Sequence, residues 1–257
     1  FNSKVVLITG AANGIGRELA LQLDNQKCHK MILIDVDKVR LGDLIGQLKT
    51  PVSSIILDLS SNISTNKSLI DEVNNCHPDV VIANAGVGGL NPGDNFSEEI
   101  NQKMMQINYF GTTGLISLVL PKMIQKGQGH IIGVASLAGL RGMPQAASYC
   151  ASKAAQITFL ESLRLDVKSY GIKVTTVLPG FIKTKMTNHN DFKMPFMLSV
   201  SKTASKIIDV IKKEKSVFYF PFPINLLSII NKFLPVFIYD WLILFLNPSE
   251  KKQPKIF

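Results

Sequence analysis

The chain has 257 residues, of which 46% are apolar and 18% charged, a composition that fits a folded domain with a full core and excludes a disordered or fibrous protein. Its formal net charge is +9, but no aromatic and basic recognition motif accompanies the lysines, so nucleic acid is not an expected partner. Its three cysteines form no CxxC pair, its four histidines lack metal-ligand spacing, and its first residues lack the pattern of a secretory signal, so we expect no disulfide framework, no metal site and a cytoplasmic location.

Short apolar, β-branched runs recur along the chain, and each is too short for a helix. They predict strands at residues 5–8, 31–34, 54–57, 80–83, 130–134, 173–177 and 217–220. Longer stretches between them have apolar residues at helical spacing, as in Ile15, Leu19 and Leu23. The alternation predicts a doubly wound α/β (Rossmann) fold, with a mostly parallel seven-stranded sheet and helices on both faces. We expect one domain over residues 1–220, followed by an apolar helical extension over residues 221–257.

The turn after the first predicted strand is rich in glycine. Residues 9–16 read TGAANGIG and lead directly into a helical pattern. Glycines allow a tight turn and let a pyrophosphate approach the backbone, where the amides of a helix N-terminus satisfy its negative charge. We therefore expect a dinucleotide to contact Gly10, Asn13, Gly14, Ile15 and Gly16.

An acid ends the second predicted strand. The Asp35 carboxylate can accept hydrogen bonds from both ribose hydroxyls, and it would repel the extra phosphate of NADP. No Arg or Lys lies within two positions after it, and Asn13 occupies the turn position where a basic residue would help to hold that phosphate. We therefore predict NAD as the cofactor, with NADP less favoured.

Three residues have the spacing of a proton-transfer site. Tyr149 and Lys153 lie four residues apart on a predicted helix, so their side chains share one face, and Ser136 follows the fifth predicted strand. A phenol has a pKa of about 10, and an adjacent ammonium stabilises the phenolate. Such a pair can exchange a proton with an alcohol while Ser136 holds the substrate oxygen.

Together these motifs resemble the short-chain dehydrogenase/reductase family, in its single-domain branch, over residues 4–184. Further matches are the adenine contact at Asp58 and Leu59, the motif beside the central strand at Asn84, Ala85 and Gly86, the family asparagine at Asn108, and the nicotinamide segment at Pro179, Gly180, Ile182 and Thr184. One departure is minor: the asparagine motif begins with Ala83 where many members have a second asparagine.

The resemblance implies roles for these residues. Tyr149 would be the acid/base, Ser136 would orient the carbonyl or alcohol, and Lys153 would bind the nicotinamide ribose and lower the tyrosine pKa. Asn108 would hold a water that links Lys153 to solvent. The family also commonly pairs subunits through two long helices, here near residues 101–126 and 148–168, which implies a homodimer or homotetramer.

We therefore expect an oxidoreductase that transfers hydride between NAD(H) and a secondary alcohol or ketone. Two alternatives stay open: an NADPH-dependent carbonyl reductase, and a non-catalytic nucleotide-sensing scaffold with the same fold. Residues 185–200 are rich in Met, Phe and Leu, which favours a lid near residues 185–213 over a lipophilic substrate; a short helix packed on the core is the alternative.

The C-terminal extension differs in composition from the rest of the chain. Residues 183–257 hold twelve lysines and five acids, whereas residues 224–246 hold only Lys232 and Asp240 as charges. Because Pro235 divides this apolar stretch, we predict two short amphipathic helices and not one membrane span. Tyr239, Trp241 and the flanking lysines are typical of helices in a membrane interface, which favours peripheral contact with a membrane surface. Capping of the substrate pocket and a subunit contact are the alternatives.

Overall fold

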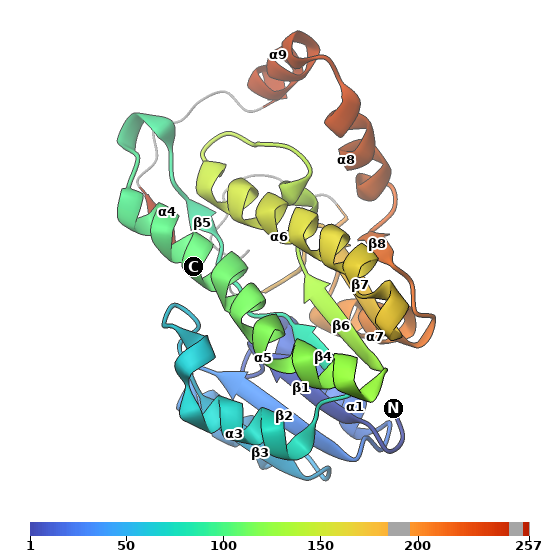
Figure 1. The fold of residues 1–257 in the computed structure, drawn as a ribbon. Helices are drawn as coiled ribbons and strands as arrows, with labels where there is room; N and C mark the ends of the chain where they lie inside the picture. Colours follow the sequence, from blue (N-terminus) through green and yellow to red (C-terminus); the bar gives the residue numbers. More distant parts are fainter. Residues whose placement is uncertain (185–195, 247–253, 257) are drawn as a thin grey trace.

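A computed structural model describes residues 1–184, 196–246 and 254–256 of the chain (Figure 1). Seven parallel strands form one sheet in the order β3-β2-β1-β4-β6-β7-β8, which confirms the predicted seven-stranded Rossmann sheet. The strands are β1 Val5–Thr9, β2 Lys30–Asp35, β3 Val52–Ile56, β4 Val80–Ala83, β6 Gly129–Val134, β7 Ile172–Pro179 and β8 Val217–Phe220. Every predicted strand overlaps an observed one.

Helices cover both faces of the sheet, as a parallel sheet requires. The long helices of the domain are α1 Gly14–Asp24, α2 Lys38–Ile45, α3 Lys67–Cys76, α4 Glu98–Met105, α5 Gly111–Lys126, α6 Ala147–Asp166 and α7 Val200–Lys212. Short 3-10 turns lie at Ile63–Thr65, Gly93–Asn95, Leu137–Gly139 and Lys168–Tyr170, and one π-helical turn lies at Gln106–Phe110. Since strand residues alternate between faces, neighbours such as Leu7 and Ile8 enter separate buried clusters, one under each helical layer.

The strand order fixes the place of the site. β1 lies between β2 and β4, so the chain leaves β1 toward one side of the sheet and later returns to the other side. The carboxyl ends of β1 and β4 therefore border the crevice at which open α/β sheets bind their ligands.

The predicted lid falls partly on a described helix. Residues 185–195 lie outside the described residues, so their part of the prediction has no structural counterpart here. α7 buries Ala204, Ile207 and Ile208 and packs against α1. This part of the segment therefore belongs to the helical cover of the sheet.

The C-terminal extension forms two helices, α8 Ile224–Phe233 and α9 Val236–Leu246, which meet at Pro235 as expected. No described helix is both long and apolar enough to cross a bilayer. The chain end adds a short strand that was not predicted, β9 Lys255–Ile256, which pairs antiparallel with β5 Gly89–Leu90. Lys212, Lys213 and Lys215 lie before the amino end of β8, whereas α8 follows its carboxyl end, so these lysines do not flank α8 in space.

Candidate active site

A cavity of about 530 Å³ opens over the carboxyl ends of β1, β4 and β6. Of the residues predicted from the sequence, those that line it are Gly10, Asn13, Gly14, Ile15, Asp35, Asp58, Leu59, Asn84, Ala85, Gly86, Ser136, Tyr149, Lys153, Pro179, Gly180, Ile182 and Thr184. Gly16 and Asn108 are not among the lining residues. Motifs about 170 positions apart in the sequence, such as those at Gly10 and Gly180, thus line the same cavity.

The glycine-rich turn is shaped by close backbone contacts. Gly10 and Gly14 have φ angles of +67° and +52°, in a region of backbone conformation that residues with a Cβ atom rarely adopt. A Cβ atom on Gly16 would lie 2.1 Å from the carbonyl oxygen of Gly10, so Gly16 does not line the cavity but lets α1 approach β1. Asn84 holds the turn from the neighbouring strand, because its Nδ2 donates to the carbonyl oxygens of Thr9 at 3.0 Å and Gly10 at 3.3 Å.

The N-terminus of α1 points into the cavity with room for a phosphate. Asn13 is the N-cap residue, yet its side chain makes no capping hydrogen bond. A Cβ on Gly14 would meet only Thr184, at 3.7 Å. Open amides at a helix N-terminus favour an anion, so the turn fits the pyrophosphate of a dinucleotide.

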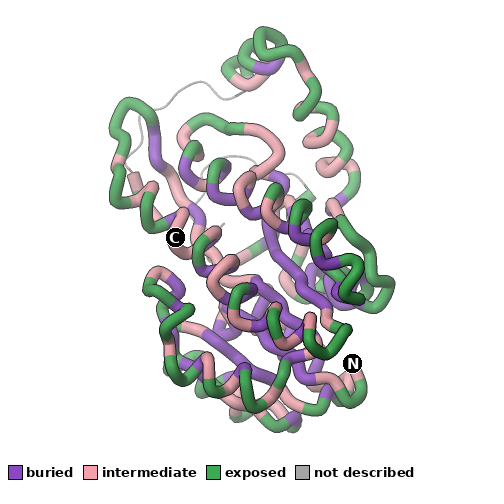
Figure 2. The backbone as a smooth tube through the Cα atoms, viewed as in Figure 1, coloured by how far each residue is buried: buried purple, intermediate pink, exposed green. Residues whose placement is uncertain are grey.

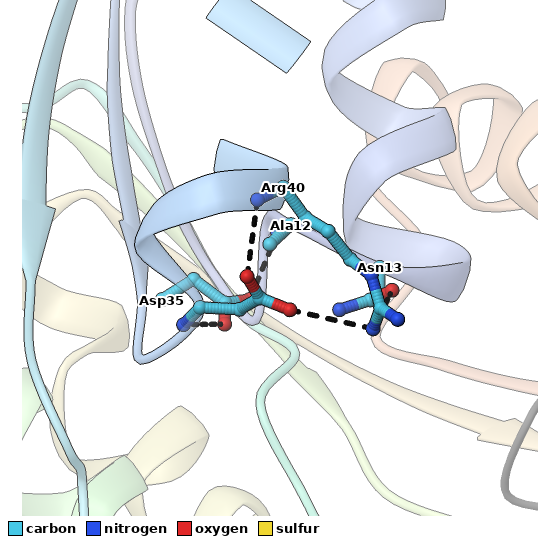
Figure 3. A network of polar contacts seen from close by, with 5 residues as sticks. Ala12, Asn13, Asp35 and Arg40 are labelled. Atoms are coloured by element: carbon cyan, nitrogen blue, oxygen red, sulfur yellow. Dashed lines mark hydrogen bonds and ion pairs between the residues drawn. The ribbon is translucent and has the colours of Figure 1, made fainter. Parts of the chain in front are cut away.

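The far end of the cavity combines an acid with a base (Figure 3). The Asp35 carboxylate accepts from the backbone amides of Ala12 at 2.8 Å and Asp37 at 3.0 Å. Arg40, one turn into α2, reaches back to this edge: its Nη1 donates to Oδ1 of Asn13 at 3.1 Å and lies 3.3 Å from the Asp37 carboxylate. Arg40 was not predicted, because it lies five residues past Asp35 and only the two positions after Asp35 were considered for a basic residue.

A tight turn after β3 holds the two residues predicted to contact adenine. Asp58 accepts a hydrogen bond from the Ser60 amide at 2.8 Å, which fixes the loop after β3. Leu59 is buried and packs close to Gly111, where an added Cβ would lie 3.1 Å away. Both side chains keep the cavity wall in place.

Tyr149 and Ser136 form the reacting end of the cavity. Tyr149 lies in the first turn of α6 and lines the cavity together with Ser136. Burial raises the pKa of Tyr149, and the Ser136 hydroxyl partly offsets that rise. Ser136 itself is oriented by the Ala138 amide, which donates to its Oγ at 3.2 Å.

Lys153 is buried and has no acidic partner among the residues that the structure describes. Its Nζ donates to the carbonyl oxygen of Val134 and to Oε1 of Gln156, each at 3.1 Å. Because both acceptors are neutral, burial lowers the pKa of Lys153 to about 8. The Ser136 hydroxyl lowers the pKa of Tyr149, but burial outweighs that effect. That Lys153 lowers the pKa of Tyr149 stays a prediction.

Asn108 lies one layer behind the cavity wall, in the π-helical turn between α4 and α5. Its side-chain amide makes three hydrogen bonds: Oδ1 accepts from the Val87 amide at 2.8 Å, and Nδ2 donates to the Val87 carbonyl and to Ser152, each at 2.9 Å. A series of hydrogen bonds between protein groups also joins Asn108 to Lys153. Gln156 donates to Thr112 at 3.0 Å, and Thr112 donates to the Asn108 carbonyl at 2.9 Å.

This polar chain gives Asn108 a positioning role toward Lys153, and the water at Asn108 stays a prediction. Gln156 and Thr112, which complete the chain, were not predicted. Both are buried polar residues on helices, and their sequence context offers no motif. Only the packing of α5 against α6 through the π-helical turn brings them together.

The nicotinamide segment follows β7. The Gly180 amide donates to the Phe220 carbonyl at 2.8 Å, and a Cβ on Gly180 would lie 3.2 Å from Pro221. Strand β8 thus fixes the loop that carries Pro179, Ile182 and Thr184. Apolar lining residues that were not predicted are Val36, Val87, Ile107, Val134 and Ala135.

Comparison with known proteins decides the family. The sequence profile of the short chain dehydrogenases matches residues 4–194. The chain belongs to the short-chain dehydrogenase family. It is accordingly an oxidoreductase that acts on CH–OH groups with a nicotinamide cofactor.

Individual relatives are of similar length. An uncharacterized oxidoreductase of Myxococcus xanthus is 32% identical over 246 residues, which cover 92% of this chain and 95% of that protein. The rat (Rattus norvegicus) 17-beta-hydroxysteroid dehydrogenase 13 is 31% identical, with 90% of this chain and 79% of that protein covered. A short-chain dehydrogenase from Sphingobium yanoikuyae, solved with NADPH, has the same fold, with a TM-score of 0.79 at 24% identity and coverage of 86% and 88%.

Proposed function

We propose that this short-chain dehydrogenase interconverts a lipophilic secondary alcohol and its ketone with NAD(H), and that Tyr149 is the acid/base. The observation that carries the proposal is that Ser136, Tyr149 and Lys153 line the same cavity as the glycine-rich turn. A scaffold that only binds a nucleotide has no physical need for this group of side chains.

Ser136, Tyr149 and Lys153 have separate roles in the proposed reaction. When bound, the nicotinamide supplies the carbon that accepts hydride from an alcohol or donates it to a ketone. The Ser136 hydroxyl orients the substrate oxygen, and Tyr149 Oη takes the hydroxyl proton in oxidation or returns it in reduction. Lys153 holds the ribose side of the cavity, and the chain through Gln156, Thr112 and Asn108 keeps its ammonium in place.

The cofactor preference depends on the balance between Asp35 and Arg40. Asp35 still has lone pairs for the ribose hydroxyls after its two backbone contacts, and its charge disfavours a 2′-phosphate. The charge of Arg40 is partly neutralised by Asp37. This arrangement favours NAD, while Arg40 is the specific feature that favours the second candidate, an NADPH-dependent carbonyl reductase.

The substrate class rests on the apolar walls beside the reacting end. Val87, Ile107 and Ile182 line the cavity with Tyr149, and one relative carries the name of a hydroxysteroid dehydrogenase. These features support a lipophilic alcohol or ketone. A homodimer or homotetramer through α5 and α6, and contact of residues 221–257 with a membrane surface, complete the proposal.

A chain-length series of secondary alcohols and ketones, assayed with NAD and NADP in parallel, tests this function. We expect turnover that rises with chain length, favours NAD and disappears in Tyr149→Phe. If the protein binds cofactor yet turns over no member of the series, the proposed activity is wrong.

A further inference from the structure

The helix pair α8–α9 exposes many large apolar side chains. Those more than two-fifths exposed are Leu226, Leu227, Ile230 and Phe233 on α8, and Val236, Phe237, Trp241, Leu244 and Phe245 on α9, with exposures of 47–76%. Figure 1 shows the pair standing beyond the carboxyl edge of the sheet, and Figure 2 shows that most of its backbone is classed as exposed or intermediate. Such a surface is larger than a monomeric protein normally leaves in water.

The shape of this surface fits a lipid layer. At about 100° per residue, the exposed positions of α9 cover roughly 200° of its circumference, which is too wide for a single flat protein contact. The rings of Trp241 and Phe245 stack at 5.8 Å while both remain exposed, and large aromatic rings are enriched at membrane interfaces. Each helix is too short to span a bilayer, so the pair would lie in its surface.

Charge supports the same occupant. Residues 221–257 hold four lysines and two acids, and Lys232 is exposed at the end of α8 beside Phe233. Asp240 on α9 is exposed as well, so the described helices are close to neutral, and the basic surplus of the segment as a whole complements an anionic lipid surface.

The pair is fastened to the catalytic loop between Ser136 and Tyr149. Arg141 in that loop donates to the carbonyl oxygens of Asn231 and, at 2.7 Å, Leu234, at the end of α8. Its guanidinium also lies 3.8 Å from the centroid of the Tyr239 ring. The Tyr239 hydroxyl donates to the Gly142 carbonyl, and Tyr239 is buried, in contrast to its neighbours on α9.

We propose that α8 and α9 dock on a lipid bilayer and that Arg141 and Tyr239 couple this docking surface to the catalytic loop, so that a lipophilic substrate reaches Ser136 and Tyr149 from the membrane. The inference rests on the proposed function for the nature of the substrate. Arg141 and Tyr239 are positioning residues in this account, since they act through the loop that ends at Tyr149.

Docking is tested by flotation of the full chain with phosphatidylcholine vesicles, with and without phosphatidylserine. We expect the wild type to float, more strongly with phosphatidylserine, and Phe237→Gln combined with Trp241→Gln to reduce binding by at least about tenfold. Leu165→Gln combined with Tyr170→Gln is the matched control, because these side chains are 62% and 51% exposed far from the pair. Equal flotation of the first variant and the wild type would overturn the proposal.

A parallel measurement of molar mass in solution separates lipid from protein partners. A wild-type oligomer that Phe237→Gln with Trp241→Gln splits into smaller species would show that the pair is an interface between copies, contrary to the proposal. An unchanged molar mass together with lost flotation supports a lipid surface.

Coupling is tested with Arg141→Gln and Tyr239→Phe, after their melting temperatures have been matched to the wild type. We expect both variants to float normally but to lose the rate gain that vesicles give with a long-chain secondary alcohol. The rate gain is taken relative to each variant's own turnover of a short alcohol in water, so that a direct effect on catalysis is separated from the effect of vesicles. An undiminished rate gain in both would overturn the coupling.

These experiments distinguish failure of the membrane inference from failure of the proposed catalytic activity of Tyr149. Flotation is measured without cofactor or substrate, and the short alcohol reports catalysis without vesicles. If turnover in water requires Tyr149 but the chain does not float, only the membrane inference fails; if the chain floats but Tyr149→Phe retains turnover, only the proposed function fails.

Discussion

Nη1 of Arg40 lies 3.1 Å from Oδ1 of Asn13. This contact brings a cation from α2 to the glycine-rich turn, at the end of the cavity where Asp35 lies (Figure 3). The Asp35 carboxylate and the Arg40 guanidinium therefore lie near the same region of the predicted cofactor site with opposite charges. Their relative effect can be measured as the preference for NAD or NADP.

Asp35→Ser should shift the preference from NAD toward NADP. Removal of the carboxylate removes its repulsion of a 2′-phosphate. It leaves Arg40 as the cation that lines this end of the cavity. We expect the ratio of kcat/KM for NAD over NADP to fall by about 10–100-fold, a change of roughly 1.4–2.7 kcal/mol. Direct calorimetric titration with NADP should show the same trend.

Arg40→Gln is the matched control for that experiment. In the Asp35→Ser background it should reverse most of the gain in NADP affinity while NAD affinity changes little. If the NAD to NADP ratio of Asp35→Ser equals that of the wild type, Asp35 does not determine the preference.

Ser136→Ala should affect both the rate and its pH dependence. The Ser136 hydroxyl opposes the rise in the pKa of Tyr149 that burial causes, so its loss raises that pKa further. Alcohol oxidation needs the tyrosinate, so its profile should shift to higher pH, whereas ketone reduction needs the phenol and should stay active to higher pH. We expect kcat to fall about 100-fold or more. An unshifted oxidation profile would show that Ser136 does not interact with the base.

Gly16→Ala should destabilise the protein or abolish cofactor binding. The new Cβ would lie 2.1 Å from the backbone oxygen of Gly10, so α1 would have to move. Gly42→Ala is the control: a Cβ at that position, inside α2, meets nothing within 4 Å. We expect Gly42→Ala to stabilise the fold by up to about 1 kcal/mol. Wild-type melting and NAD affinity in Gly16→Ala would contradict the close approach.

Sequence patterns predicted most of the fold because burial imposes them locally. Both faces of β1 and β4 are covered, so their residues are apolar except for Thr9 at the end of β1, and the short runs identify the strands. The glycines of the turn were recognisable for a similar reason, since a backbone that must approach β1 tolerates no side chain.

Other features depend on distant contacts that no local pattern records. Arg40 belongs to α2 by sequence, and only the turn of that helix brings it back to Asn13. Arg141 is an ordinary loop residue until α8 and α9 fold against it. The pairing of β9 with β5 likewise joins segments more than 160 residues apart.

His130 should make the fold sensitive to mild acid. Its ring is buried and its Nε2 lies 2.8 Å from Thr175 Oγ1, whose proton is directed to the Lys215 carbonyl, so the neutral Nε2–H form fits the site. Burial lowers the pKa of His130 from 6.5 to about 4. Because the unfolded chain binds the proton first, stability should fall as the pH drops from 6.5 to 4, by about 3 kcal/mol from this group.

The measurement is the free energy of unfolding in urea across that pH range. His130→Gln should flatten the curve, and His29→Gln, at an exposed position, should leave it unchanged. Identical pH dependence in the wild type and His130→Gln would contradict the buried neutral histidine.

The central claim is that Tyr149 transfers the proton in a nicotinamide-dependent reaction. It is tested most directly by comparing wild type and Tyr149→Phe for NADH binding by fluorescence and for single-turnover oxidation of a secondary alcohol. We expect NADH affinity to stay within about threefold and the rate to fall by about 10³-fold or more. Retention of the wild-type rate with intact NADH binding would contradict the account.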